Sequence, residues 1–172
     1  DGLEKVASGF AYGINGVEDV LDPSVTFSYQ GSDETIYALS SSAPVAAGTY
    51  LSTALFAGND NYNAIENTAA IVISKKEASV TPIASTKTYG EFDPSFTGLV
   101  DGFLEADGVS AVYSRTSGET VIGSPYSISA ALSPVEILSN YNITYNTADF
   151  TITTKEASVT PTASGKTYGD AD

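Results

Sequence analysis

The chain contains an internal repeat. An 18-residue stretch, KEASVTPIASTKTYGEFD, begins at Lys76 and returns as KEASVTPTASGKTYGDAD from Lys155. The copies share 14 positions at an offset of 79 (155 − 76 = 79). A fixed period indicates that one structural unit is copied along the polypeptide. The sequence therefore predicts a tandem array in which residues 1–76 form one unit, 77–154 form a second, and 155–172 are the opening strand of a third.

The stretch that joins the units has no flexible linker. The segments AAIVISKKEASVTP and ADFTITTKEASVTP pass from a closing strand into an opening strand without a Gly/Ser-rich or Pro-rich spacer. We therefore expect junctions of two or three residues, held by strand pairing on both sides. Such junctions favour a semi-rigid rod. Residues 155–172 lack a partner module, so they are either frayed or added to the sheet of a neighbour.

The periodicity of both units is typical of β-strands. Val25, Phe27 and Tyr29 alternate with polar residues, and the same two-residue period appears at residues 126–131 and 150–153. One short helical turn is predicted over residues 101–107. We expect a mainly β chain of two small antiparallel modules, each most simply an Ig-like sandwich. A β-grasp-like α+β module is the alternative for the second unit.

Composition excludes several functional classes. The net charge is −14, with a pI near 4.1, and the seven Lys and Arg residues are scattered, which argues against a nucleic-acid partner. No apolar run approaches the length of a membrane span, so we expect no membrane insertion of this segment. Without Cys, disulfides and thiolate sites are excluded. Without His or a phosphate-binding Gly-rich loop, we expect no enzyme, no catalytic residue and no organic cofactor.

Calcium is the metal that an acidic β module of this kind would bind. The densest carboxylate cluster is Asp101, Glu105 and Asp107, with Glu91 and Asp93 in the preceding loop. Its spacing does not match an EF-hand. The favoured interpretation is that Asp101 and Asp107 form turns before the glycines that follow them.

Tyrosines recur at equivalent places in the units. The Tyr-Gly pairs at residues 12–13, 89–90 and 168–169 are interpreted as a core-covering ring followed by a positive-φ turn, rather than as exposed sugar-stacking rings. Tyr62 and Tyr141, each flanked by Asn, are interpreted as a corner where a strand begins. A Lys-to-Asn crosslink stays open as an alternative, because no pair of residues is singled out.

Family resemblance adds a functional context. The segments KTYGEFDPSFTGLVDG and SNYNITYNTADFTITTKEASVTP resemble the MBG repeat of the YGX type, whereas the first unit, with SVTFSYQG and AGTY, resembles MBG/YDG or bacterial Ig-like repeats. The resemblance implies stalk or extender repeats of secreted or cell-surface bacterial adhesins, with adjacent repeats as partners. The alternative is that the repeats themselves bind glycans, mucin or matrix and host proteins.

Overall fold

The computed structural model describes residues 2–171 and is mainly β, as predicted. Its ten strands form three small sheets, and its helical content is limited to three short 3-10 segments in the described part of the chain. No helix within residues 2–171 has the length and apolar character needed to cross a membrane.

The first group of strands is an antiparallel meander. Tyr29, Tyr50 and Phe56 are almost fully buried, so three aromatic rings form most of its core. The alternation seen in the sequence accounts for this, because each ring lies on one face of its strand. The segment before the meander carries one short helix and a single bridge between Tyr12 and Val20. The elements are η1 (Gly16–Glu18), β1 (Thr26–Gly31), β2 (Gly48–Phe56) and β3 (Ile65–Ile73), with sheet order β1-β2-β3.

The second group of strands forms a four-stranded and a three-stranded sheet. The orders are β5-β10-β8-β7 and β6-β4-β9. The elements are β4 (Lys76–Pro82), β5 (Ser85–Thr88), β6 (Gly98–Asp101), η2 (Glu105–Asp107), β7 (Ser110–Arg115), β8 (Tyr126–Ser133), η3 (Val135–Asn140), β9 (Tyr141–Tyr145) and β10 (Ala148–Thr153). The predicted helical turn is present at the end of its expected range, as η2.

Pairing in this second group is mixed, whereas the sequence led us to expect antiparallel pairing throughout. β4 pairs in parallel with β9, and β5 pairs in parallel with β10. The segments 76–88 and 141–153 each pass from one sheet to the other, so they stay side by side in both. Alternation of apolar and polar residues specifies which face of a strand is buried, but it does not specify the direction of the neighbouring strand.

The core of the second group lies between these sheets. Ile128 and Phe150 have no exposed surface, Ile152 is 1% exposed, and Tyr126 closes the same cluster. Phe96 packs edge-on against Phe150, with ring centroids 5.3 Å apart. The buried positions of β8 and β10 are those that the two-residue period predicts.

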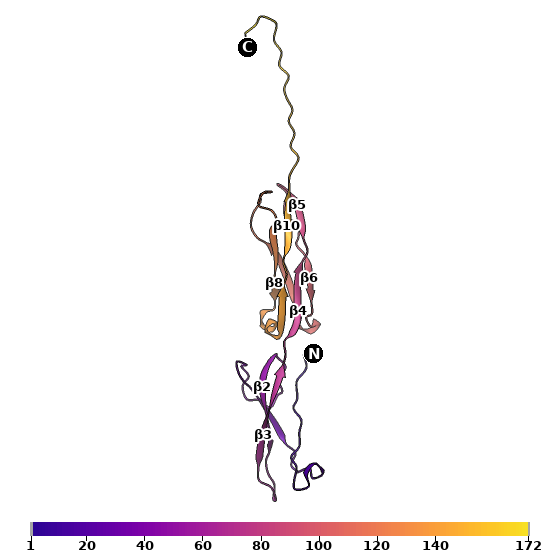
Figure 1. Cartoon of the computed structure of the whole chain (residues 1–172), viewed down its shortest axis with the longest axis vertical. Helices are drawn as coiled ribbons and strands as arrows, with labels where there is room; N and C mark the ends of the chain where they lie inside the picture. Colours follow the sequence, from indigo (N-terminus) through magenta and orange to yellow (C-terminus); the bar gives the residue numbers. More distant parts are fainter. Residues whose placement is uncertain (1, 172) are drawn as a thin grey trace.

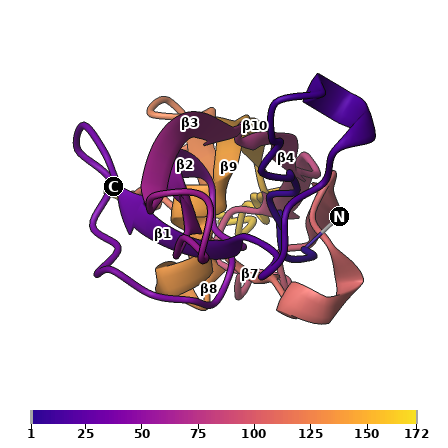
Figure 2. The same ribbon diagram turned by 90° about the horizontal axis from the view of Figure 1, so that it is seen from below.

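The two groups of strands stack end to end along one long axis (Figure 1). Viewed along that axis, they project onto largely the same area (Figure 2). Beyond β10 the chain continues as an extended segment, and residues 154–171 form no strand. The opening strand expected over residues 155–172 is therefore not formed in its described part, whereas its counterparts β4 and β5 pair with β9 and β10 from the end of their own unit.

Candidate functional site at the junction between the units

A direct strand-to-strand connection joins the two groups. β3 ends at Ile73 and β4 begins at Lys76, so only Ser74 and Lys75 lie between them. This confirms the short junction predicted from the sequence. Two residues leave the chain little freedom, because strand pairing fixes the backbone on both sides.

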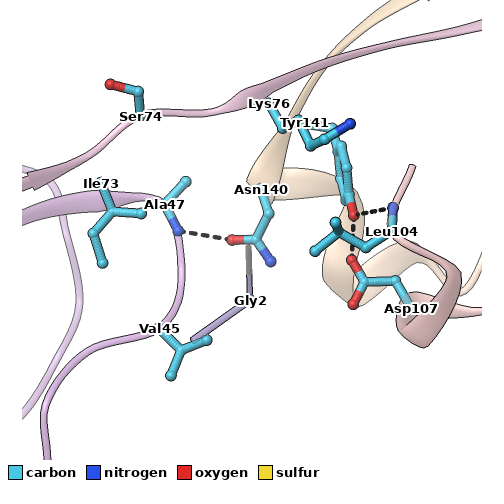
Figure 3. A pocket seen from close by; sticks show the side chains of 10 residues that line it. All are labelled: Gly2, Val45, Ala47, Ile73, Ser74, Lys76, Leu104, Asp107, Asn140 and Tyr141. Atoms are coloured by element: carbon cyan, nitrogen blue, oxygen red, sulfur yellow. Dashed lines mark hydrogen bonds between the residues drawn. The ribbon is translucent and has the colours of Figure 1, made fainter. Parts of the chain in front are cut away.

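Side chains from both groups line a cleft of about 150 Å³ at this junction (Figure 3). The backbone N–H of Ala47, just before β2, donates to Oδ1 of Asn140, at the end of η3, at 2.9 Å. Val45 and Ile73 line the first-group side of the cleft, and Leu104 lines the opposite side. Asn140 is the first residue of the second Asn-Tyr-Asn motif. In this structure it makes a hydrogen bond across the junction.

Tyr141 lines the cleft on the side of the second group. The residue is 4% exposed, and its ring packs on Phe103 at a centroid distance of 4.7 Å. Its hydroxyl accepts the Leu104 N–H at 3.0 Å and donates to the carboxylate of Asp107. Burial, followed by the neighbouring Asp107 carboxylate, raises the pKa of Tyr141 above its ordinary value. The tyrosine therefore stays neutral and fixes the loop over residues 104–107. β9 begins at this residue, in agreement with the predicted corner, whereas at the equivalent Tyr62 the next strand, β3, begins only at Ile65.

The three candidate calcium ligands lie close in sequence but serve different contacts. The Asp107 carboxylate accepts a hydrogen bond from the Tyr141 hydroxyl. Asp101 is the last residue of β6, where it lies opposite Ser79 in the strand register, and Glu105 is the first residue of η2. Gly102 and Gly108, which follow the two aspartates, both have positive φ. Among residues 2–171, no group of three or more His, Cys, Asp or Glu side chains is placed to hold a metal ion. Glu91 and Asp93 also bind elsewhere: Glu91 accepts the Thr88 N–H at 3.1 Å, and Asp93 faces two cations.

These cations belong to a cluster at the other end of the second group. Lys87 Nζ lies 2.7 Å from Asp93 Oδ1, and Arg115 Nε lies 2.6 Å from Asp93 Oδ2. Glu119 binds both cations as well. The side chains of Lys87 and Arg115 are only 4% and 7% exposed. Buried cations require such pairing, because an unpaired charge pays the full cost of desolvation.

The cluster is electrostatically matched. Hydrogen bonding from Arg115, with a further contribution from Lys87, lowers the pKa of Asp93 to about 2. Hydrogen bonds to Lys87 and Arg115 lower the pKa of Glu119, and hydrogen bonds to Asp93 and Glu119 raise the pKa of Lys87. All four groups are therefore charged at neutral pH. Within the cluster, two cations are paired with two carboxylates beside the core.

Sequence reasoning did not identify this cluster. Arg115 also lies over the ring of Phe150, with its guanidinium carbon 4.7 Å from the centroid, and Lys87 lies 5.9 Å from the same centroid. The sequence offered one indication, because Lys87 stands at a position of β5 where the two-residue alternation places a buried side chain. A lysine at a buried strand position indicates an ion-pair cluster only when its acidic partners are known. Glu119, one of these partners, is 32 residues away in the sequence.

The Tyr-Gly pairs only partly match their interpretation. Gly90 and Gly169 have positive φ, at 85° and 99°, whereas Gly13 does not have a positive φ. Tyr89 and Tyr12 are 51% and 45% exposed, and Tyr168 is fully exposed. In this structure these rings therefore do not cover a core end.

Comparison with protein families supports the sequence-level identification of the second unit. No curated protein and no solved structure gives a significant match to the chain. One family model does match, over residues 78–151, and this stretch begins in β4 and ends in β10. From the matched residues and the mainly β structure, we conclude that the chain carries, over residues 78–151, an MBG domain of the YGX type.

Proposed function

We propose that this chain is an extender segment of a secreted or cell-surface bacterial adhesin, in which repeats project a distal adhesive domain. The observation that supports the proposal is the end-to-end stacking of the two strand groups across a junction of two residues. A continuous path from β3 to β4 converts each added unit into added length, because little bending is available between them.

The chemistry of the surface agrees with a structural role. The cluster around Lys87 pairs two cations with two carboxylates, so its charges neutralise one another. Asn140 and Tyr141 line the junction cleft, where Asn140 Oδ1 accepts the Ala47 N–H and the Tyr141 hydroxyl binds the Leu104 N–H and Asp107. The role we propose is therefore non-enzymatic, and its immediate partners are the adjacent repeats of the same chain. A net charge of −14 keeps such a rod soluble through self-repulsion.

Small-angle X-ray scattering tests the extender role. A protein that carries several consecutive repeats is expected to give an extended profile, with a maximum dimension that grows by a constant increment for each repeat. A compact profile, or one that requires a broad range of angles between units, would remove the proposal.

The second candidate is a binding module for glycans or for matrix and host proteins. It is favoured by exposed aromatic rings at residues that directly follow β5, where Tyr89 is half exposed and Phe92 is 98% exposed. A glycan-array screen of this chain, with a Tyr89→Ala, Phe92→Ala double variant as control, separates the two roles. Specific, saturable binding that the double variant loses would establish the binding role, and its absence leaves the extender role.

A further inference from the structure

The first and last strands of the second unit run side by side in parallel along its whole length. Lys76 pairs with Tyr141 at the start of β4, and Thr88 pairs with Thr153 at the end of β5. Paired residues are 65 positions apart at both places, as are the side-chain partners between them. The register therefore continues unchanged although both strands pass from one sheet to the other.

Additional hydrogen bonds join these same two strands outside the regular ladder. Near the junction, the Asn142 side-chain amide donates to the Glu77 carboxylate at 2.9 and 3.0 Å. In the middle, Asn146 donates from its side chain to Thr81 Oγ1 at 2.8 Å and from its backbone to the Val80 carbonyl at 2.9 Å. These contacts bridge the point at which the strands change sheets, so the connection between them is not interrupted there.

The far end of the same pair is joined as well. Thr86 Oγ1 donates to the Thr151 carbonyl at 2.9 Å, and Thr153 Oγ1 donates to the Lys87 carbonyl at 3.2 Å. The Tyr89 N–H donates to the Thr153 carbonyl at 2.9 Å. Lys87 is itself fixed by the Asp93 and Glu119 carboxylates.

The path of the chain determines how tension reaches this pair. The chain enters the second unit through β4, which begins beside the first unit, and leaves it after β10 at the opposite pole (Figure 1). Tension along the chain therefore pulls the first strand backward from its start and the last strand forward from its end. Two parallel strands loaded in this way are in shear. They can separate only by sliding past each other, so all the hydrogen bonds between them bear the load together.

We propose that the parallel pair formed by residues 76–88 and 141–153 is a shear-loaded clamp that makes the second unit resistant to stretching along the chain. The inference deepens the proposed extender role and rests on it for its biological use, since a stalk that anchors a bound cell must carry tension. β7 and β8, in contrast, lie off this path: they are joined to each other in an antiparallel hairpin arrangement and carry neither the entry nor the exit of the chain.

Force-clamp measurements on single molecules of the full chain, tethered through terminal cysteines, test the clamp. The chain has no cysteine of its own, so the tether points are unambiguous. The test variants are Asn142→Ala, Asn146→Ala and Thr86→Val, each of which removes a side-chain donor between the clamp strands. The matched controls are Ser110→Ala and Ser133→Ala, which remove an exposed hydroxyl contact of 3.3 Å between β7 and β8.

Each clamp variant is expected to raise the unfolding rate of the second unit at fixed tension by about fivefold. The folded state loses one hydrogen bond that must break before the unfolding transition state is reached, so the barrier is lower. The controls are expected to leave that rate unchanged, even where urea denaturation shows an equal loss of stability. Equal acceleration by clamp and control variants, or no acceleration by either set, would overturn the clamp. Scattering reports on the extender role separately, since a compact profile removes the stalk without altering the response of the second unit to force.

Discussion

At the scale of single residues, the balance of the Lys87 cluster is the most testable feature. Four charged side chains meet beside the core, and two of them, Lys87 and Arg115, are almost completely shielded from water. Pairing of this kind gives stability that depends on the protonation of the carboxylates, because a neutral acid no longer compensates a buried cation.

Asp93→Asn is expected to change the acid limb of the stability profile. The folded-state pKa of Asp93 is about 2, below an unfolded-state value of about 3.9, so its contribution is present above the higher value. The contribution is lost as pH falls from about 4 toward about 2. Urea denaturation across this range is expected to show a shallower decline for Asp93→Asn than for the wild type. Asp60→Asn, on an exposed turn, serves as the control and keeps the wild-type slope. Identical slopes for all three proteins would contradict the assigned role of Asp93.

The contact between Lys87 and Asp93 is expected to be an ion pair and not an amide crosslink. Arg115 binds both carboxylate oxygens of Asp93 and holds its pKa low, and an ionised carboxylate is a poor electrophile. Intact mass spectrometry of the purified chain should give the mass calculated from the sequence. A mass lower by one water would show that an amide has formed.

At the scale of elements, the loop between β7 and β8 depends on a glycine. Gly118 has a φ of 146°, and a Cβ at this position would meet the ring of Tyr126 at 2.0 Å. The Tyr126 hydroxyl accepts the Thr120 N–H at 3.0 Å and donates to the Thr120 carbonyl at 2.9 Å, so the ring cannot move away without losing these bonds.

Gly118→Ala is therefore expected to destabilise the second unit by about 1–3 kcal/mol, through backbone strain and overpacking. Gly165→Ala is the matched control, because nothing lies within 4 Å of a Cβ there and its φ is not left-handed. Urea denaturation of both variants measures the difference. A Gly118→Ala protein as stable as the control would show that the loop can rearrange around Tyr126.

The elements also show which parts of the fold were predictable. The strands around Ile128 and Phe150 could be predicted because burial alternates with every second residue. The parallel register of β5 with β10 could not be predicted, because alternation in the sequence indicates which face of a strand is exposed but not which strand lies beside it. The same limit hid the Lys87 cluster. The candidate ligand Asp107 was singled out by its charge, but its hydrogen bond to Tyr141 depends on the packing of η2 against the start of β9, 34 residues away in the sequence.

At the scale of the whole molecule, the proposed stiffness rests on the two-residue connection and on the contact between Ala47 and Asn140. Inserting four glycines between Ser74 and Lys75 is expected to free the two units from each other, because Gly-rich chain behaves as a random coil. Scattering should then show a shorter average extension than for the wild type, despite the longer chain. An unchanged extension would mean that side-chain contacts alone hold the two units in line.

The most direct test of the central claim is the distribution of distances between the units. Spin labels at Glu66→Cys on β3 and Ser133→Cys on β8 occupy exposed strand positions, and the chain contains no other cysteine. Pulsed electron paramagnetic resonance of this doubly labelled chain is predicted to give one narrow distance peak, which broadens on insertion of the four glycines. A broad distribution in the protein without the insertion would contradict the rod, and with it the proposed extender function.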